Sequence, residues 1–257
     1  MAYKRLIGSL IVKNGYLVKS YSYNFWRPAG SISSALKILD SWKVDEIFII
    51  DISANNSIDI KLLDQIKNSK ITTPITYGGG IRKPDDINLI LDSGCDRILV
   101  ETLLYDNDKN LIEINNIIGK QAIVASIPVY FDGNNYISWY HFKTNKKIIN
   151  IKDLILNMDT SQFSEYLFTD VNNEGKEGFF SMKLFEKIKD LDISLLKHKA
   201  IYFGGIDLKA ANIILDDPLT VGIAIGNVNL ERELVIPKIR TSLGAKNKIE
   251  CIRKINL

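Results

Sequence analysis

Short apolar runs alternate with amphipathic segments along the whole chain. The apolar runs are rich in β-branched residues and span residues 6–12, 47–51, 74–77, 97–101, 122–129, 166–170, 200–203 and 220–225. Nearly continuous apolar runs of this length are typical of parallel strands that are covered on both faces. The pattern therefore predicts eight parallel strands.

The segments between these runs have the spacing of amphipathic helices. Their apolar positions include Ile32, Ala35, Leu36 and Leu39 in one segment, Ile87, Ile90 and Leu91 in another, and Met182, Phe185 and Ile188 in a third. Ser31 precedes the first of these segments and is a suitable N-cap. Alternation of strand and helix predicts βα units joined by right-handed crossovers.

The two halves of the chain repeat each other. Phe203-Gly204-Gly205-Ile206 echoes Gly78-Gly79-Gly80-Ile81, which lies 125 residues earlier, and residues 47–51 match 166–170 at a separation of 119. A period near half the chain length indicates two fused halves of four βα units each. With 257 residues, the sequence predicts one α/β domain, residues 1–257, folded as a (β/α)8 TIM barrel with a two-fold internal repeat.

Two stretches interrupt the alternation. Residues 14–30 follow the first strand and are rich in aromatic side chains, and residues 130–149 follow the fifth. Asp132-Gly133 lies between two alternating runs in the second stretch, which predicts a β-hairpin. Both stretches belong to βα loops, and these loops form the active face of a barrel.

Composition excludes several classes of protein. The formal charge of +3 is too balanced to indicate nucleic-acid binding. Cys95 and Cys251 form no recognisable disulfide or zinc framework, and no cofactor or metal site is predicted. No signal-peptide pattern and no membrane-length apolar run is found, so we expect a cytoplasmic protein that does not bind membranes.

Ordered motifs resemble one known family. Lys4-Arg5-Leu6-Ile7 and residues 12–19 resemble the opening of the cyclase subunit (HisF-type) of imidazole glycerol phosphate synthase, and residues 76–82, 94–102 and 204–205 extend the match over nearly the whole chain. Lys19 and Thr76 match a mobile active-face loop and the barrel lining. The resemblance implies that a class-I, HisH-like glutaminase docks at the barrel's N-terminal face and that its ammonia crosses the interior. At the top face, the family cleaves and cyclises a bisphosphorylated ribonucleotide.

The family's two acid–base aspartates have no counterpart in this sequence. The resemblance places them at Ile11 and Pro128, and neither side chain can exchange a proton. Cyclase chemistry is therefore expected to be lost, unless other acids replace the aspartates. Asp51 and Asp170 end the second and sixth predicted strands and are the possible substitutes.

The family's two phosphate sites are degraded. One maps to Gly79, Gly80 and Thr102, and the other to Gly204, Gly205 and Gly226. Glu101 replaces an asparagine beside Thr102, and its carboxylate would repel a phosphate. Gly226 replaces a serine of the second site. The remaining glycines are either a surviving anion site or turn residues inherited with the fold.

Four charged residues match the family's ammonia gate. Arg5, Glu46, Arg97 and Glu165 begin the first, second, fourth and sixth predicted strands, and Arg97 lies where the family often has lysine. Two cations and two anions around one pore satisfy each other through charge-assisted hydrogen bonds. They form either a gate for ammonia or a salt-bridge cluster that plugs the barrel.

The leading hypothesis is a HisF-like subunit that conducts ammonia from a glutaminase to a third enzyme at the top face. Similar paralogues work in surface-polysaccharide (O-antigen) systems, which implies an amidotransferase acting on an activated sugar. One alternative is an active imidazole glycerol phosphate synthase cyclase of histidine biosynthesis. Another is a non-catalytic scaffold that stabilises a glutaminase.

Overall fold

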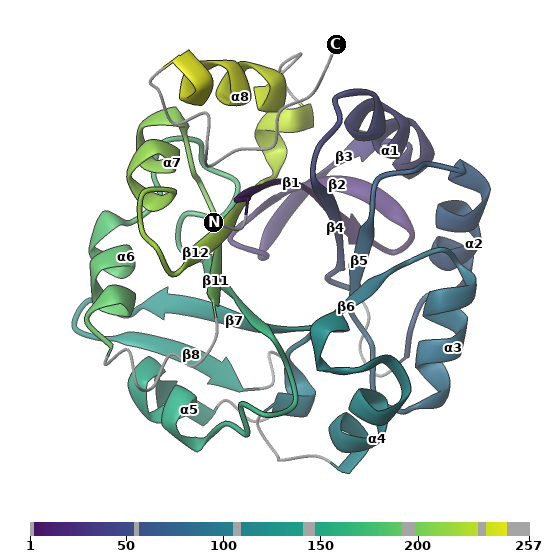
Figure 1. The fold of residues 1–257 in the computed structure, drawn as a ribbon, viewed down its shortest axis with the longest axis horizontal. Coiled ribbons are helices and arrows are strands. Elements are labelled where there is room, and N and C mark those ends of the chain that lie inside the picture. Colours follow the sequence, from purple (N-terminus) through teal and green to yellow (C-terminus); the bar gives the residue numbers. More distant parts are fainter. Residues whose placement is uncertain are drawn as a thin grey trace.

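The computed structural model describes residues 3–53, 57–104, 109–140, 147–191, 199–230 and 235–245. Eight of the described strands close into a parallel barrel (Figure 1). In ring order they are β1 (Arg5–Lys13), β4 (Glu46–Asp51), β5 (Ile75–Gly78), β6 (Arg97–Val100), β7 (Ile123–Phe131), β10 (Glu165–Asp170), β11 (Lys199–Phe203) and β12 (Thr220–Ile225). β12 pairs with β1, and β7 pairs with β10, which closes the ring. The predicted TIM barrel is confirmed.

Helices surround the ring of strands (Figure 1). They are α1 (Ile32–Ser41), α2 (Ile60–Ser69), α3 (Asp85–Asp92), α4 (Lys109–Ile118), α5 (Ile151–Asn157), α6 (Met182–Lys189), α7 (Leu208–Ile214) and α8 (Val235–Ala245). Short 3-10 helices span Thr102–Leu104, Lys120–Ala122 and Asn227–Leu230. None of the described helices is long and apolar enough to cross a membrane.

The sequence pattern located these elements closely. The Ser31 hydroxyl caps α1 by accepting a hydrogen bond from the Ser34 amide, as predicted. The prediction that Leu91 lies on the apolar face of its helix was wrong, because Leu91 is 39% exposed while Ile87 and Ile90 are buried. Cys95 is buried and free, and Cys251 lies outside the described residues.

The two stretches that interrupt the alternation, after the first and fifth barrel strands, both contain antiparallel strands. β8 (Tyr136–Tyr140) pairs with the end of β7 across the predicted Asp132-Gly133 turn, and β9 (Lys147–Asn150) pairs with β8. The Asp132 carboxylate stabilises this turn by accepting hydrogen bonds from the amides of Asn134 and Asn135. The first stretch forms a second hairpin that was not predicted, in which β2 (Tyr16–Tyr21) pairs with β1 and with β3 (Phe25–Gly30).

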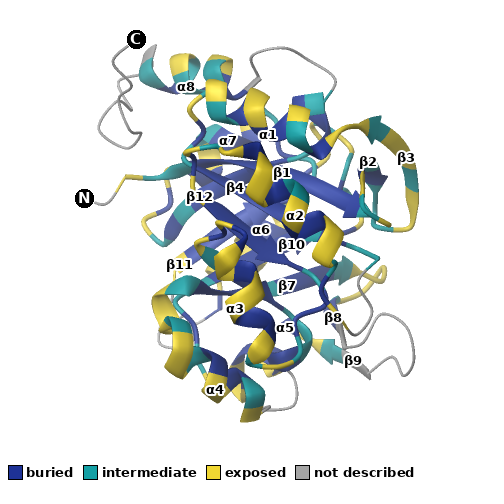
Figure 2. Ribbon diagram, turned by 90° about the vertical axis from the view of Figure 1, so that its right-hand side faces the viewer, coloured by how far each residue is buried: buried dark blue, intermediate teal, exposed yellow. Residues whose placement is uncertain are grey.

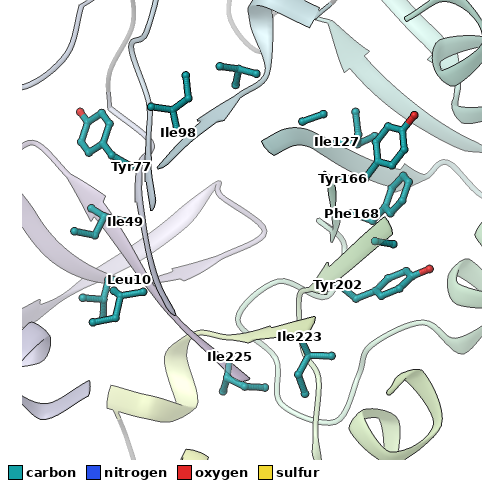
Figure 3. Close-up of a cluster of buried hydrophobic side chains, with 14 of the residues drawn as sticks. Leu10, Ile49, Tyr77, Ile98, Ile127, Tyr166, Phe168, Tyr202, Ile223 and Ile225 are labelled. Atoms are coloured by element: carbon teal, nitrogen blue, oxygen red, sulfur yellow. The ribbon is translucent and has the colours of Figure 1, made fainter. Parts of the chain in front are cut away.

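Side chains of the barrel strands alternate between two apolar layers, as strands covered on both faces require. Outer-layer residues such as Leu10, Tyr77, Phe168 and Tyr202 point away from the central space toward the helices (Figure 3). The inner layer consists of Ile7, Ile11, Val18, Phe48, Leu99, Val124, Leu167, Ile201, Phe203 and Ala224. The barrel strands are mostly buried, whereas the helices have one exposed face (Figure 2).

The internal repeat is also visible in three dimensions. Gly79 follows the third barrel strand and Gly204 the seventh, and both have positive φ angles, of 121° and 107°. A Cβ atom at Gly79 would lie 2.5 Å from the carbonyl oxygen of Asp51, and one at Gly204 would lie 2.5 Å from that of Asp170. Backbone conformation and close packing therefore require glycine at both positions.

Candidate functional site

Four charged side chains lie at the end of the barrel where the strands begin. Arg5, Glu46, Arg97 and Glu165 are the first residues of β1, β4, β6 and β10. Each lies two residues before a member of the inner apolar layer. Because side chains on a strand alternate between faces, all four point toward the barrel axis. We call these four residues the ion-pair ring.

The ion-pair ring is closed, because each arginine contacts both glutamates. Arg5 Nη1 lies 2.7 Å from Glu46 Oε2, and Arg5 Nη2 lies 2.6 Å from Glu165 Oε2. Arg97 Nη1 lies 3.2 Å from Glu46 Oε1, and Arg97 Nη2 lies 2.8 Å from Glu165 Oε2. The structure thus brings together all four residues that the sequence analysis proposed as an ammonia gate or a salt-bridge cluster.

Burial and pairing act against each other in the ion-pair ring. Burial by itself lowers the pKa of Arg5, but Glu46 and Glu165 raise it above the ordinary value. Burial by itself raises the pKa of Glu165, but Arg5 and Arg97 lower it below the ordinary value. The pairing therefore favours the charged forms of Arg5 and Glu165. Thr76, which is fully buried, donates a hydrogen bond from its hydroxyl to Glu46.

The space above the ring is mostly apolar. Ser9 lies on β1 between the inner-layer residues Ile7 and Ile11, so its side chain also faces the barrel interior. Ser9 is 1% exposed, and its hydroxyl has no hydrogen-bond partner among the described residues. A buried hydroxyl normally has a partner, so this position suits a small hydrogen-bonding molecule.

A cavity of about 440 Å³ opens at the other end of the barrel, and we call it the mouth cavity. Its lining includes Lys13, Tyr23, Asp51, Gly79, Gly80, Arg82, Leu99, Glu101, Thr102, Ser126, Pro128 and Thr169. The lining mixes apolar wall residues with two cations and two carboxylates. Among the described residues, no cluster of three or more His, Cys, Asp or Glu side chains could hold a metal ion.

The two positions that the resemblance assigns to acid–base chemistry are inert in the structure. Ile11 is 2% exposed and packs in the inner apolar layer. Pro128 lines the mouth cavity, and its carbonyl accepts a hydrogen bond from the Ser138 hydroxyl. Neither residue brings a proton donor or acceptor side chain to the cavity.

The two proposed substitute acids have local partners. Asp170 is 3% exposed, and its carboxylate accepts hydrogen bonds from Asn173 Nδ2 and from the Ser181 amide at the start of α6. Burial raises its pKa, while these hydrogen bonds lower it, and the net shift is upward. Asp51 lines the mouth cavity, but its carboxylate accepts hydrogen bonds from the amide and hydroxyl of Ser53. Both acids therefore hold βα loops in place.

The two candidate phosphate sites differ in access. Gly79, Gly80 and Thr102 line the mouth cavity. At the other site, the loop after β10 packs against Gly205, whose carbonyl accepts hydrogen bonds from the amides of Gly178 and Phe180. A Cβ at Gly205 would lie 2.5 Å from the carbonyl oxygen of Lys176. Both glycine turns pack against backbone, but only the first lines the mouth cavity.

Gly226 also lies against protein, because a Cβ atom there would lie 3.1 Å from the Phe203 ring. The neighbouring Asn227 joins the hairpin to this part of the top face. Its side-chain amide donates to the carbonyl of Ser20 at 2.6 Å and accepts from the Ser20 amide at 3.2 Å. The hairpin is thus attached to the segment that follows β12.

Buried Glu174 fixes the tip of the hairpin, and the sequence analysis missed this residue. Its carboxylate accepts hydrogen bonds from the Ser20 hydroxyl and the Tyr23 amide, and its carbonyl accepts one from the Ser22 amide. Ser22 and Tyr23 have positive φ angles, which are unusual for residues with a Cβ atom. Lys19, on β2 of the same hairpin, is partly exposed beside this network.

Glu101, which the sequence analysis placed beside Thr102 in the first phosphate site, is the other carboxylate of the mouth cavity besides Asp51 among the residues named above. It follows Leu99 by two residues and lines the mouth cavity. Burial raises the pKa of Glu101 to about 7, and the nearby Arg82 guanidinium opposes part of that shift. From the sequence, this glutamate was expected to repel a phosphate unless it was protonated or paired with a cation. The structure places it inside the cavity.

Comparison with known proteins agrees with the family resemblance. A family model described as histidine biosynthesis protein matches residues 5–234. The chain belongs to this family. A curated relative from Exiguobacterium sp., imidazole glycerol phosphate synthase subunit HisF, is 28% identical over 200 residues, or 76% of this chain and 78% of the relative. A putative subunit hisF2 of the same synthase from Campylobacter jejuni is 30% identical over 184 residues, or 71% and 73%.

The family resemblance predicts that this chain differs from the family pattern at the end of the barrel where the strands finish. Ile11 and Pro128 occupy the positions of the expected acids, and Glu101 occupies that of an expected phosphate-site asparagine. In the ion-pair ring, in contrast, each of the two arginines forms an ion pair with both glutamates.

Proposed function

We propose that this chain is a HisF-like subunit that receives ammonia from a class-I, HisH-like glutaminase at the strand N-terminal face. The ammonia passes through the barrel to an amidotransferase at the top face, and cyclase chemistry has been lost. The observation that carries this proposal is a closed ion-pair ring in a barrel whose acid–base positions are Ile11 and Pro128. The relatives are synthase subunits by name, which supports a role within a complex.

The interior above the ring supports transport of a neutral molecule. Apolar inner-layer residues disfavour an ion such as ammonium, whereas neutral ammonia loses much less hydration on entry. The unpartnered Ser9 hydroxyl supplies one hydrogen-bonding group in this interior. Ion pairs that satisfy each other exclude bulk water, and displacing one of them opens a path. An activated sugar is the proposed acceptor class, on the resemblance to paralogues of surface-polysaccharide systems.

The first test is binding and stimulation of a class-I glutaminase encoded in the same genome. We expect calorimetry to detect a complex at micromolar concentrations and glutamine hydrolysis to increase when the chain is added. Charge reversal of the exposed Lys199, at the start of β11, should weaken binding about tenfold. The matched reversal of exposed Arg27, on the top-face hairpin, should leave binding unchanged. Absence of binding, or greater sensitivity to Arg27, would contradict the docking geometry.

A further inference from the structure

Glu101 faces the interior of the mouth cavity. Side chains alternate along β6, so Glu101 lies on the same side as the ring residue Arg97 and the inner-layer residue Leu99. It therefore stands on the line of residues that runs from the ion-pair ring to the mouth. The neighbouring Thr102 begins a short 3-10 helix, and the amide of Leu104 donates to the Glu101 carbonyl, which fixes the backbone there.

Charged and titratable groups from five other elements line the same cavity or interact electrostatically with Glu101. Arg82 comes from the turn after β5 and Asp51 from the end of β4, and both line the cavity. Lys13, at the end of β1, lies 5.1 Å from the centroid of the Trp26 ring on the hairpin. The hydroxyl-bearing rings of Tyr23 and Tyr130 are also within electrostatic range of Glu101.

Glu101 differs from Asp51 in its local partners. Asp51 accepts two hydrogen bonds from Ser53. Among the described residues, Glu101 has the Arg82 charge nearby, and none of them donates a hydrogen bond to its carboxylate. A carboxylate in a partly enclosed cavity requires a cation or hydrogen-bond donors. An anionic ligand would be repelled by it, whereas a small nitrogen cation would be attracted.

We propose that Glu101 makes the mouth cavity a binding site for ammonium, formed there from ammonia. Neutral ammonia takes the proton of the carboxylic acid: the O–H bond breaks, a bond between nitrogen and that proton forms, and the O–H electron pair stays on the carboxylate. The ammonium–carboxylate pair carries the same total charge as the reactants, so the charge of the cavity is unchanged. Reversal of the step releases ammonia for reaction.

A pKa of about 7 allows Glu101 to exist in both protonation states near neutral pH. Ammonia that leaves the apolar interior would be held at the mouth as an ion and would be returned to neutral form when an acceptor is present. This role rests on the proposed function, because it takes ammonia from the barrel. The binding site itself does not, and it can be examined in the isolated chain.

The experiment is a carbon-13 NMR titration of the chain with labelled glutamate carboxyl groups, in ammonium chloride and in potassium chloride of equal ionic strength. Glu101→Gln identifies the resonance, and Glu101→Asn confirms it in a second background. Ammonium binds the ionised form, so it should lower the titration midpoint, by about 0.3 when the dissociation constant equals the ammonium concentration. Glu186, which is exposed on α6, provides the control resonance and should respond equally to both salts.

Equal Glu101 midpoints in the two salts would overturn the ammonium site. That result would leave the glutaminase complex and ammonia transfer standing, because neither is measured. Conversely, a specific ammonium effect in a chain that binds no glutaminase would support the site and contradict the proposed function.

Discussion

At the end where the barrel strands begin, four charged side chains make four ion pairs at 2.6–3.2 Å. At the end where the strands finish, the positions of the family's two expected acids hold Ile11 and Pro128, and one glycine turn is packed against a loop. The two ends are built from the same strands, yet only the first keeps the arrangement that the family resemblance predicts.

This difference indicates that the two ends serve separable tasks. A ring that only stabilised the barrel could be replaced by apolar residues at little cost, because buried ion pairs contribute little net stability. A ring that controls passage must keep its charges, whatever chemistry takes place at the mouth. Under the proposed function, the contrast reflects a barrel that conducts ammonia without catalysing the cyclase reaction, and this proposal can be tested at each end.

The largest expected effect is at the mouth. Given the family's bisphosphorylated ribonucleotide and ammonium salt, the purified chain should form no imidazole glycerol phosphate. A positioned acid or base contributes roughly 10²–10⁴-fold to the rate, and both are missing at Ile11 and Pro128. Turnover of about 1 per second or faster would instead support the active cyclase, with other acids in place of the two aspartates.

The next effect is on stability at the ring. Glu46→Ala should lower the free energy of unfolding by about 3–5 kcal/mol, because it leaves Arg5 and Arg97 with a single carboxylate and Thr76 without its acceptor. Urea unfolding measures this change. Glu113→Ala, on the exposed face of α4, is the control and should stay within about 0.5 kcal/mol of the wild type. Equal effects of the two variants would show that the ring is not closed in solution.

A smaller, pH-dependent effect is expected at Glu101. Its pKa is about 7 in the folded chain and lower when the chain is unfolded, so the wild type loses stability as the pH rises from about 4.5 to 7. Glu101→Gln has no ionisable carboxyl group at this position, so the variant does not lose this stability as the pH rises. We expect it to stabilise the fold by about 1–3 kcal/mol at pH 8 and by almost nothing at pH 4. A stability difference that does not change with pH would contradict the raised pKa.

The sequence could predict the barrel from its periodicity, and the family resemblance identified the four residues of the ring. Residues two positions apart on a strand share a face, so placing Ile7 in the interior also places Arg5 there. The hairpin at the mouth was not predicted, because its tip has Ser22 and Tyr23 in the left-handed region and no glycine. That conformation depends on Glu174, which lies far away in the sequence.

The directions of the carboxyl groups at the mouth could not be predicted for a related reason. Asp170 ends its strand as expected, but contacts with Asn173 and Ser181 hold it against its own loop. The sequence analysis placed Glu101 at a phosphate site, and the structure adds that it lines an open cavity with Arg82 nearby. Loop packing decides both orientations, and it has no periodic signal in the sequence.

The most direct test of transport uses Arg5→Ala in the complex with the glutaminase and the amidotransferase. Removing Arg5 leaves Glu46 and Glu165 facing one cation, and the cost of about 1–3 kcal/mol should be tolerated by a barrel of this size. Glutamine labelled with nitrogen-15 in its amide group is supplied together with excess unlabelled ammonium, and the label in the aminated product is measured. The wild type should transfer mainly labelled nitrogen, whereas the folded variant should transfer mainly unlabelled nitrogen from solution. An unchanged labelled fraction in folded Arg5→Ala would show that the ring does not control the passage of ammonia.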